Sequence, residues 1–434
     1  MTQQPKLVRG LGLMGASSVV IGTTIGSGVF LVSAEMTRGM GTPAGVFFVW
    51  IFAGALSLAG ALTYAELASA LPEAGGEYNY LRAGYGPLWA FLYGWMQMLI
   101  GKPGSLATLG AGFARYCSFF FPTVPQKAVS FATIVLLGVV NYFGVKTSGF
   151  VQTLLTFLKI ALILGLVAGA LLTGKGSWSN FSTSIPVGGA FAGFIAALVA
   201  ALWAYDGWNN VAMVAGEVEK PERNLPLALI AGTAAVGALY ILANVAYFYV
   251  LPAAKVASAE RVAADVARVF MGDRGGAFVA IAAMVSIFAA INGSILSGSR
   301  VPFAMAADGR FFRAIAVVHP RFHAPSNSVI FLCAIGALMS LTGTYEQLFN
   351  YVIFGSWIFY GAATAAVIAL RIKRPDLPRP YRTWGYPVLP AIFVTVAAAL
   401  AVSILWEHPA RAGIGLLIIA AGVPAFYYWE GKRA

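Results

Sequence analysis

The sequence has few charged residues, and this scarcity excludes most soluble folds. Only 10% of its 434 residues are Asp, Glu, Lys or Arg, whereas 59% are hydrophobic. Soluble domains carry about a quarter charged residues, so this chain has too few to cover a surface that faces water. The mean hydropathy of +0.79 agrees with this. The composition therefore predicts an integral membrane protein.

Cysteine and histidine are also scarce, with two and three residues respectively. Cys117 and Cys333 lie far apart in the chain, so neither a disulfide framework nor a metal-binding spacing is predicted. The histidines, at 319, 323 and 408, fall in predicted loops or at the ends of apolar runs. We therefore expect no metal, no cofactor and no enzyme activity. The net charge of +12 does not indicate a nucleic-acid partner, because the basic residues also lie at the ends of apolar runs.

Long apolar runs are abundant. A membrane-spanning helix needs about twenty apolar residues, and about twelve runs qualify: 11–34, 42–71, 88–118, 127–145, 151–173, 190–215, 227–251, 276–299, 327–343, 346–371, 388–406 and 412–429. Lys and Arg are more frequent in the loops that share a side with both termini, which predicts that both termini are cytoplasmic. The segments 72–87, 253–274 and 299–322 are predicted as short interfacial or re-entrant structures, with ordinary solvated loops as the alternative. Residues 217–224 are expected to form a cytoplasmic turn with solvated charges.

The centre of the first span contains glycine where a continuous helix favours alanine or leucine. Residues 21–28 read IGTTIGSG, and each glycine costs about 1 kcal/mol of helix stability relative to alanine. One interpretation is a close helix–helix contact, since small residues pack well in lipid. The other is an unwound stretch whose free N–H groups, at the start of a half-helix, bind a carboxylate.

The centre of the sixth span favours the second interpretation. Residues 202–210 read LWAYDGWNN, and an acid, two indoles and two amides are costly beside lipid, so they should line a cavity. Gly207 offers a flexible point, and the freed carbonyls around it could accept hydrogen bonds from an ammonium group. Donors at one broken helix and acceptors at the other suit a zwitterion, so the predicted substrate is an α-amino acid.

These stretches resemble the L-type amino acid transporter (LAT) family of the amino acid–polyamine–organocation (APC) superfamily. The similar segments are GTTIGSGVF at 22–30, WAYDGWNNVAMVAGEVEKPERNLPLA at 203–228, INGSILSGSR at 291–300 and RIKRPDLPRPYR at 371–382. The resemblance covers nearly the whole chain. It implies an all-α, LeuT-like fold of two inverted five-helix repeats, at 11–173 and 190–371, followed by two more helices within 388–429. It also implies sodium-independent exchange of amino acids by alternating access.

The resemblance further implies roles for individual residues. The substrate carboxylate would be received by the backbone of five residues: Thr24, Ile25, Gly26, Ser27 and Gly28. The amino group would be received, mainly through carbonyls, at Trp203, Ala204 and Asp206, and Trp203 would take the place of the gating aromatic residue. Further candidates for the cavity wall are Ser286, Asn292, Ser294, Ser297, Phe354, Ser356 and Trp357, each of which could instead serve helix packing.

Trp203 and Asp206 bear on the size and charge of the substrate. The indole should leave little room for a side chain, which favours small neutral L-amino acids such as alanine, serine, cysteine or threonine. A carboxylate that faces the site would favour a cationic substrate, but it would lack a counter-charge whenever a neutral substrate is bound. We therefore expect Asp206 to point away from the substrate and bond to backbone. The alternative function is a proton-coupled amino acid symporter, or a carrier of cationic amino acids or polyamines.

Two lysines lie inside predicted spans. Lys159 is near the middle of the fifth, too deep to reach the interface easily, so a functional role is the default. It resembles the fifth-span lysine of this family, whose amine occupies the place of the sodium ion in sodium-coupled relatives, and we expect it to link the first span to the eighth near Ser286 to Ser294. Lys102 precedes Pro103, and a structural role is expected for it.

Animal members of the family pair with a glycoprotein, the heavy subunit, through a disulfide in the loop after the third span. The corresponding loop here, 121–125, holds no cysteine, so no such heavy subunit is expected. This fits a bacterial-type member of the family in an inner (plasma) membrane.

Overall fold

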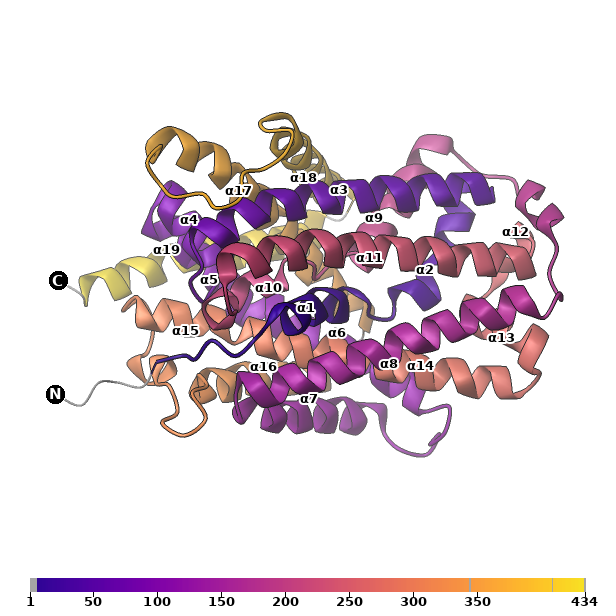
Figure 1. Ribbon diagram of the computed structural model, residues 1–434, viewed down its shortest axis with the longest axis horizontal. Helices are drawn as coiled ribbons and strands as arrows, with labels where there is room; N and C mark the ends of the chain where they lie inside the picture. Colours follow the sequence, from indigo (N-terminus) through magenta and orange to yellow (C-terminus); the bar gives the residue numbers. More distant parts are fainter. Residues whose placement is uncertain (1–5, 343–344, 408, 433–434) are drawn as a thin grey trace.

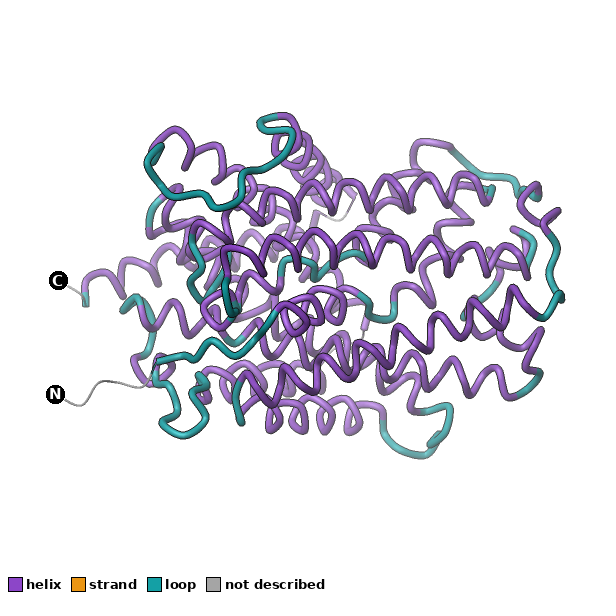
Figure 2. The backbone as a smooth tube through the Cα atoms, in the orientation of Figure 1, coloured by secondary structure: helices purple, strands orange, loops and turns teal. Residues whose placement is uncertain are grey.

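Long helices run roughly side by side along the longest axis of the molecule (Figure 1). The computed structural model describes residues 6–342, 345–407 and 409–432. Within these ranges nearly every residue is in a helix or a short connection, as Figure 2 shows, and the only β-type pairing is an isolated bridge between Leu11 and Val218. Both termini lie at the same end of the bundle.

The helices follow one another with short connections. In the first half they are α1 (Leu13–Thr24), α2 (Gly28–Met40), α3 (Pro43–Ala70), α4 (Glu77–Tyr85), α5 (Pro87–Met96), the π-helix η1 (Gln97–Gly101), α6 (Lys102–Cys117), α7 (Gln126–Tyr142), α8 (Val145–Leu172) and the 3₁₀-helix η2 (Trp178–Ser182). In the second half they are α9 (Ala190–Ala204), α10 (Asn210–Met213), η3 (Ala215–Glu217), α11 (Pro221–Val250), α12 (Ala253–Ser258), α13 (Val262–Met271), α14 (Arg274–Gly298), α15 (Arg300–Ala307), η4 (Arg313–Ala316), α16 (Ser326–Thr342), α17 (Tyr345–Lys373), α18 (Val388–Glu407) and α19 (Pro409–Gly431).

Each predicted span coincides with one helix or with two or three successive helical segments. By length and composition alone, seven helices in the described part of the chain can cross a membrane, and the bent pair α1 and α2 makes an eighth. The helices α7, α9 and α16 are apolar but shorter. The prediction of a multi-span, all-α membrane protein is therefore confirmed, whereas the count of twelve spans remains a prediction.

The fifth span shows how the bundle is organised. On α8 the apolar side chains of Phe150, Leu154 and Phe157 are exposed, while Gln152 and Lys159 on the opposite face are buried. This is the reverse of a soluble helix, in which the polar face is exposed. Lipid solvates the exposed apolar face, and the buried polar groups are satisfied by neighbouring helices.

The segments predicted as interfacial or re-entrant contain short helices, namely α4 within 72–87, α12 and α13 within 253–274, and α15 and η4 within 299–322. Their place at a membrane interface stays a prediction. The expectation of solvated charges at 217–224 is wrong for Glu217. Its carboxylate is fully buried and receives two hydrogen bonds from Arg300, at 2.6 and 2.9 Å. The backbone carbonyl of Glu217 also accepts from the N–H groups of Gly10 and Leu11. These contacts attach the segment before α1 to the end of the sixth span.

Candidate functional site

The first span is broken at its centre. The helix α1 ends at Thr24, α2 begins at Gly28, and the two are bent by 43°. Gly26 and Ser27 lie in neither helix, and their N–H groups make no hydrogen bond to any described residue. They stand at the N-terminus of α2, where free N–H groups and the helix dipole attract an anion.

The sixth span is also broken. The helix α9 ends at Ala204, α10 begins at Asn210, and Gly207 between them has a φ of 109°, which glycine adopts readily and other residues rarely do. The N–H of Asp206, which would reach Leu202 in a continuous helix, donates instead to the carbonyl of Trp203. The carbonyl of Leu202 therefore accepts no hydrogen bond from the described residues. This carbonyl is an available acceptor that was not among the residues predicted to receive the amino group.

The two breaks touch each other, and glycine makes the approach possible. A Cβ atom on Gly28 would lie 2.7 Å from the Cβ atom of Ala204, and one on Gly207 would lie 2.9 Å from the carbonyl oxygen of Thr23. The hydroxyl of Thr23 in turn donates to the carbonyl of Gly207 at 2.8 Å. Both interpretations of the glycine-rich stretch therefore hold: it is unwound, and it is a close contact.

A cavity of about 80 Å³ lies where the breaks meet. Sites for drug-sized ligands are typically about 300–1,000 Å³, so this one suits a much smaller molecule. It is lined by ten of the residues proposed from the sequence, namely Thr24, Gly26, Ser27, Gly28, Trp203, Ala204, Asp206, Ser294, Ser356 and Trp357. Lys102, Ser105, Thr108, Leu109 and Asn210 are among the remaining wall residues.

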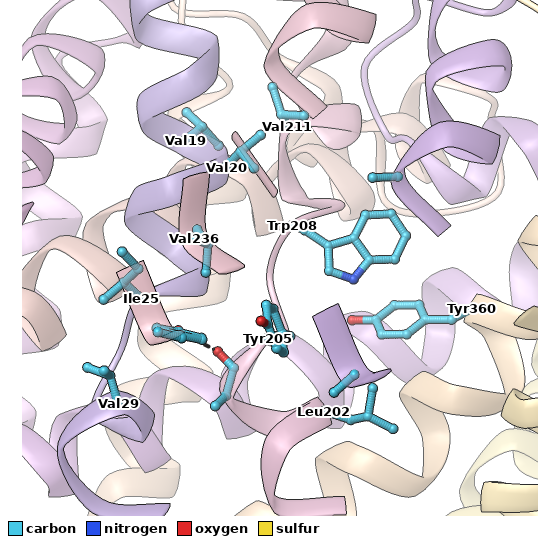
Figure 3. Close-up of a cluster of buried hydrophobic side chains, with 14 of the residues drawn as sticks. Val19, Val20, Ile25, Val29, Leu202, Tyr205, Trp208, Val211, Val236 and Tyr360 are labelled. Carbon is cyan, nitrogen blue, oxygen red and sulfur yellow. Dashed lines mark hydrogen bonds between the residues drawn. The ribbon is translucent and has the colours of Figure 1, made fainter. Parts of the chain in front are cut away.

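Other proposed residues lie outside the cavity wall. The side chain of Ile25 is buried in the apolar cluster of Figure 3, and its carbonyl points to Lys159 and Ser286. The amide of Asn292 donates to the carbonyl of Ser148 at 3.1 Å, away from the cavity, and Ser297 donates to the carbonyl of Gly293 within its own helix. The side chain of Phe354 lies outside the described part of the structure.

Lys159 joins three elements behind the first break. Its ammonium group donates to the carbonyls of Gly22 at 2.8 Å, Ile25 at 2.6 Å and Ser286 at 3.0 Å. The Ser286 hydroxyl donates to the carbonyls of Ile25 and Gly26, both at 2.9 Å. The side chain of Lys159 is fully buried and forms no ion pair with a described residue. As the sequence predicted, it links α8 to the first break and to α14, and its charge is balanced by carbonyl dipoles.

Asp206 is among the residues that line the cavity, as is Lys102, and its carboxylate accepts a hydrogen bond from the Tyr360 hydroxyl at 2.9 Å. That its carboxylate points away from the substrate stays a prediction. Figure 3 shows Tyr360 beside Trp208 on one side of the sixth-span break. The carboxylate of Asp206 is thus held by α17.

Lys102 is part of a buried polar network. Its ammonium group donates to the Asn210 side chain at 2.5 Å. The neighbouring Asn209 donates to the buried carboxylate of Glu77, which also accepts from Tyr93 at 3.0 Å. These contacts tie the sixth span, just after its break, to α4 and to the third span. The structural role predicted for Lys102 is accompanied by a place in the cavity wall.

Sequence reasoning missed a row of polar residues on α11. The hydroxyl of Tyr240 donates to the carbonyls of Ala204 at 2.7 Å and Thr24 at 3.1 Å, so one side chain bridges both breaks. Asn244 accepts from Ser33 of α2 at 2.8 Å, and Tyr247 donates to the carbonyl of Val29 at 3.0 Å. Their spacing of four and three residues puts them on one face of the helix, and that periodicity was the available signal.

Comparison with known proteins agrees with the geometry. The family model of amino acid permeases matches residues 11–426. A serine/threonine exchanger of Bacillus subtilis, SteT, is 34% identical over 100% of this chain and 99% of its own length. The human cystine/glutamate transporter is 32% identical over 99% of this chain and 87% of its own length. The human b(0,+)-type amino acid transporter 1 is 31% identical over 92% and 84%. The chain therefore belongs to the amino acid permease family of the APC superfamily, and to its LAT-type branch of membrane transporters.

Proposed function

We propose that this protein exchanges small neutral L-amino acids across a membrane, without sodium, by alternating access. The observation that carries the proposal is the cavity between the two breaks, which has free N–H donors at Gly26 and Ser27 and a free acceptor at the Leu202 carbonyl. A carboxylate at the first break and an ammonium group at the second would satisfy them. The printed activity of the bacterial relative, serine/threonine exchange, is of the same class.

The size of the cavity supports small substrates. Its volume of about 80 Å³ and the presence of two indoles, Trp203 and Trp357, leave little space for a long side chain. The hydroxyl and amide groups of Ser294, Ser356 and Asn210 in the wall suit a short polar side chain such as that of serine. We therefore expect serine, threonine and alanine to be carried better than leucine or phenylalanine.

Lys159 supports independence from sodium. Its ammonium group is already bonded to three carbonyls at the first break and on α14. A hard cation such as Na⁺ would bind to a similar set of backbone oxygens. Here the amine of Lys159 takes the place of the cation. Uptake should therefore be unchanged when sodium is replaced by potassium.

Contacts above and below the cavity support alternating access. On the side of the termini, the bridge between Leu11 and Val218 closes the space between the two broken spans. On the other side, Gly39 of α2 and Gly193 of α9 are so close that a Cβ atom on Gly39 would lie 2.4 Å from the Gly193 carbonyl oxygen. Opening one contact at a time would expose the cavity to each side in turn. We assign α1 to α8 to the first repeat, α9 to α17 to the second, and the termini to the cytoplasm of a bacterial cell.

We expect the protein to work without a disulfide-linked subunit. Cys117 lies in the last turn of α6 rather than in the loop that follows, and Cys333 is buried in α16. Non-reducing electrophoresis of membranes should show the same mobility with and without reductant. A reductant-sensitive band of higher mass would contradict this expectation.

The decisive experiment is uptake of radiolabelled L-serine into proteoliposomes. Vesicles preloaded with serine should take up label much faster than empty ones, with equal rates in sodium and potassium buffers. Equal uptake by loaded and empty vesicles would contradict obligatory exchange, and a requirement for sodium would contradict the role of Lys159.

The position of Asp206 favours one alternative, which is transport of cationic amino acids or polyamines, or symport of amino acids with protons. Asp206 lines the cavity, and under this alternative its carboxylate pairs with a distal positive charge on the substrate. Under this alternative arginine competes with serine as well as threonine does, and Asp206→Asn removes arginine competition alone. Under the leading proposal arginine competes poorly in both proteins, and an imposed pH gradient does not drive uptake.

A further inference from the structure

A second and larger cavity lies at the end of the bundle away from both termini. Its volume is about 510 Å³, and it is walled by the end of α6, the connection from α11 to α14, and the first turns of α14 (Figure 1). It shares no wall residue with the central cavity. Unlike a lipid-facing groove, it contains five charged side chains, namely Lys255, Glu260, Arg261, Asp265 and Arg268.

Two of these charges neutralise each other, and three remain available. Arg268 forms an ion pair with Asp265 at 3.0 Å. The side chains of Lys255, Glu260 and Arg261 form no ion pair with any residue in the described ranges. The unpaired set is thus two cations and one anion.

Of these three residues, Arg261 is positioned by a contact with the ring of Tyr116. It is half-buried, and its guanidinium carbon lies 5.4 Å from the centre of the Tyr116 ring. Tyr116 itself is buried, and its hydroxyl has no hydrogen-bond partner among the described residues. A guanidinium stacked on an aromatic ring keeps its N–H groups free for a carboxylate.

We propose that this cavity binds a free zwitterionic amino acid, as a second site separate from the transport site. The carboxylate would pair with Arg261 and Lys255, and the ammonium group with Glu260. The choice of ligand rests on the proposed function, because it is the class of molecule that the transporter meets at its entrance. The rim residues Lys255 and Glu260 are exposed, so binding is weaker than in the central cavity and sensitive to salt.

The position of the cavity connects it to the broken first span. The carbonyl of Ala257, on α12, accepts a hydrogen bond from Arg38 of α2 at 2.8 Å. The helices α12 and α13 also pack against α2. A ligand that joins Lys255, Glu260 and Arg261 would fix this connection, and with it the outer half of the first span. Occupancy would therefore slow the opening of this end of the transporter.

Equilibrium binding of radiolabelled L-serine to the detergent-purified full chain tests the proposal without assuming an orientation. Wild-type protein should bind two molecules per chain, one of them weakly. Gly26→Leu, which would place a side chain in the central cavity, should leave only the weak site. Arg261→Gln should weaken that site about fivefold and Glu260→Gln similarly, and raising the salt from 0.05 to 0.5 M should weaken it several-fold. The matched control is Arg274→Gln, because Arg274 is an exposed arginine at the same end that does not line the cavity.

Glycerate, which lacks the ammonium group of serine, distinguishes a zwitterion site from an anion site. Glycerate should compete poorly at the weak site of Gly26→Leu, and equal competition would overturn the assignment of Glu260. A single site in wild-type protein that Gly26→Leu removes would overturn the second site and leave the proposed transport function intact. No serine binding by either protein would overturn both proposals.

Discussion

Removing the Lys159 ammonium group is the sharpest test of how the first break is held. In Lys159→Ala three carbonyls, those of Gly22, Ile25 and Ser286, lose a charged donor at 2.6–3.0 Å. The Ser286 hydroxyl still reaches Ile25 and Gly26. The carbonyl of Gly22 has no such replacement.

The expected effect follows from these contacts. A hydrogen bond to a charged group contributes about 1.5–3 kcal/mol, and leaving a buried partner unsatisfied costs about 1–3 kcal/mol. Removing the burial of a charge offsets part of this loss. We therefore expect a net cost of about 2–4 kcal/mol for organising the carboxylate end of the site, which is roughly a 30- to 1,000-fold loss in exchange rate.

The assay is serine exchange in proteoliposomes at matched protein content, with thermal unfolding and size-exclusion profiles as checks on folding. Lys175→Ala is the control, because Lys175 is an exposed lysine just after the same helix. Lys159→Gln, which keeps a neutral donor, should lie between the wild type and Lys159→Ala. Exchange at the wild-type rate by a folded Lys159→Ala protein would refute the reasoning.

Three other substitutions probe the contact between the breaks. Gly28→Val should abolish exchange, because even the first added carbon would lie 2.7 Å from Ala204, whereas Gly189→Val, at a glycine with nothing within 4 Å, should be neutral in the same uptake assay. Gly207→Ala should lower the unfolding temperature, since a φ of 109° disfavours a side chain and the added carbon would crowd Thr23; an unchanged thermal transition would count against strain there. Tyr240→Phe removes the one hydroxyl proton that the carbonyls of Ala204 and Thr24 share, worth about 1–2 kcal/mol, so uptake should fall roughly 5- to 30-fold. The exposed Tyr427→Phe serves as its control, and equal uptake by both would rule out the bridge.

Part of the candidate site could be predicted from the sequence, because burying a polar group in a membrane costs much free energy. Gly26, Gly28 and the run from Trp203 to Asn210 differ from their apolar neighbours. Polar residues are costly inside a membrane, so such a run indicates a functional site. The same argument identified Lys159, whose predicted link to the first break and to Ser286 is present. Helix existence was equally predictable, since lipid leaves the backbone no other partner than itself.

The remaining features depend on which helices are in contact, and no local sequence pattern predicts those contacts. The Leu202 carbonyl became available only because the Asp206 N–H turned to Trp203, and the direction of Asp206 was decided by Tyr360, 154 residues away. The sequence predicted that Glu217 is a solvated loop charge, whereas in the folded chain it forms a buried ion pair with Arg300. Composition and the positions of the polar residues thus determined that this chain is a membrane protein, and they predicted where a zwitterion would bind. Tertiary packing decided which atoms face that site, because a polar group buried away from water takes the partner that the fold brings to it.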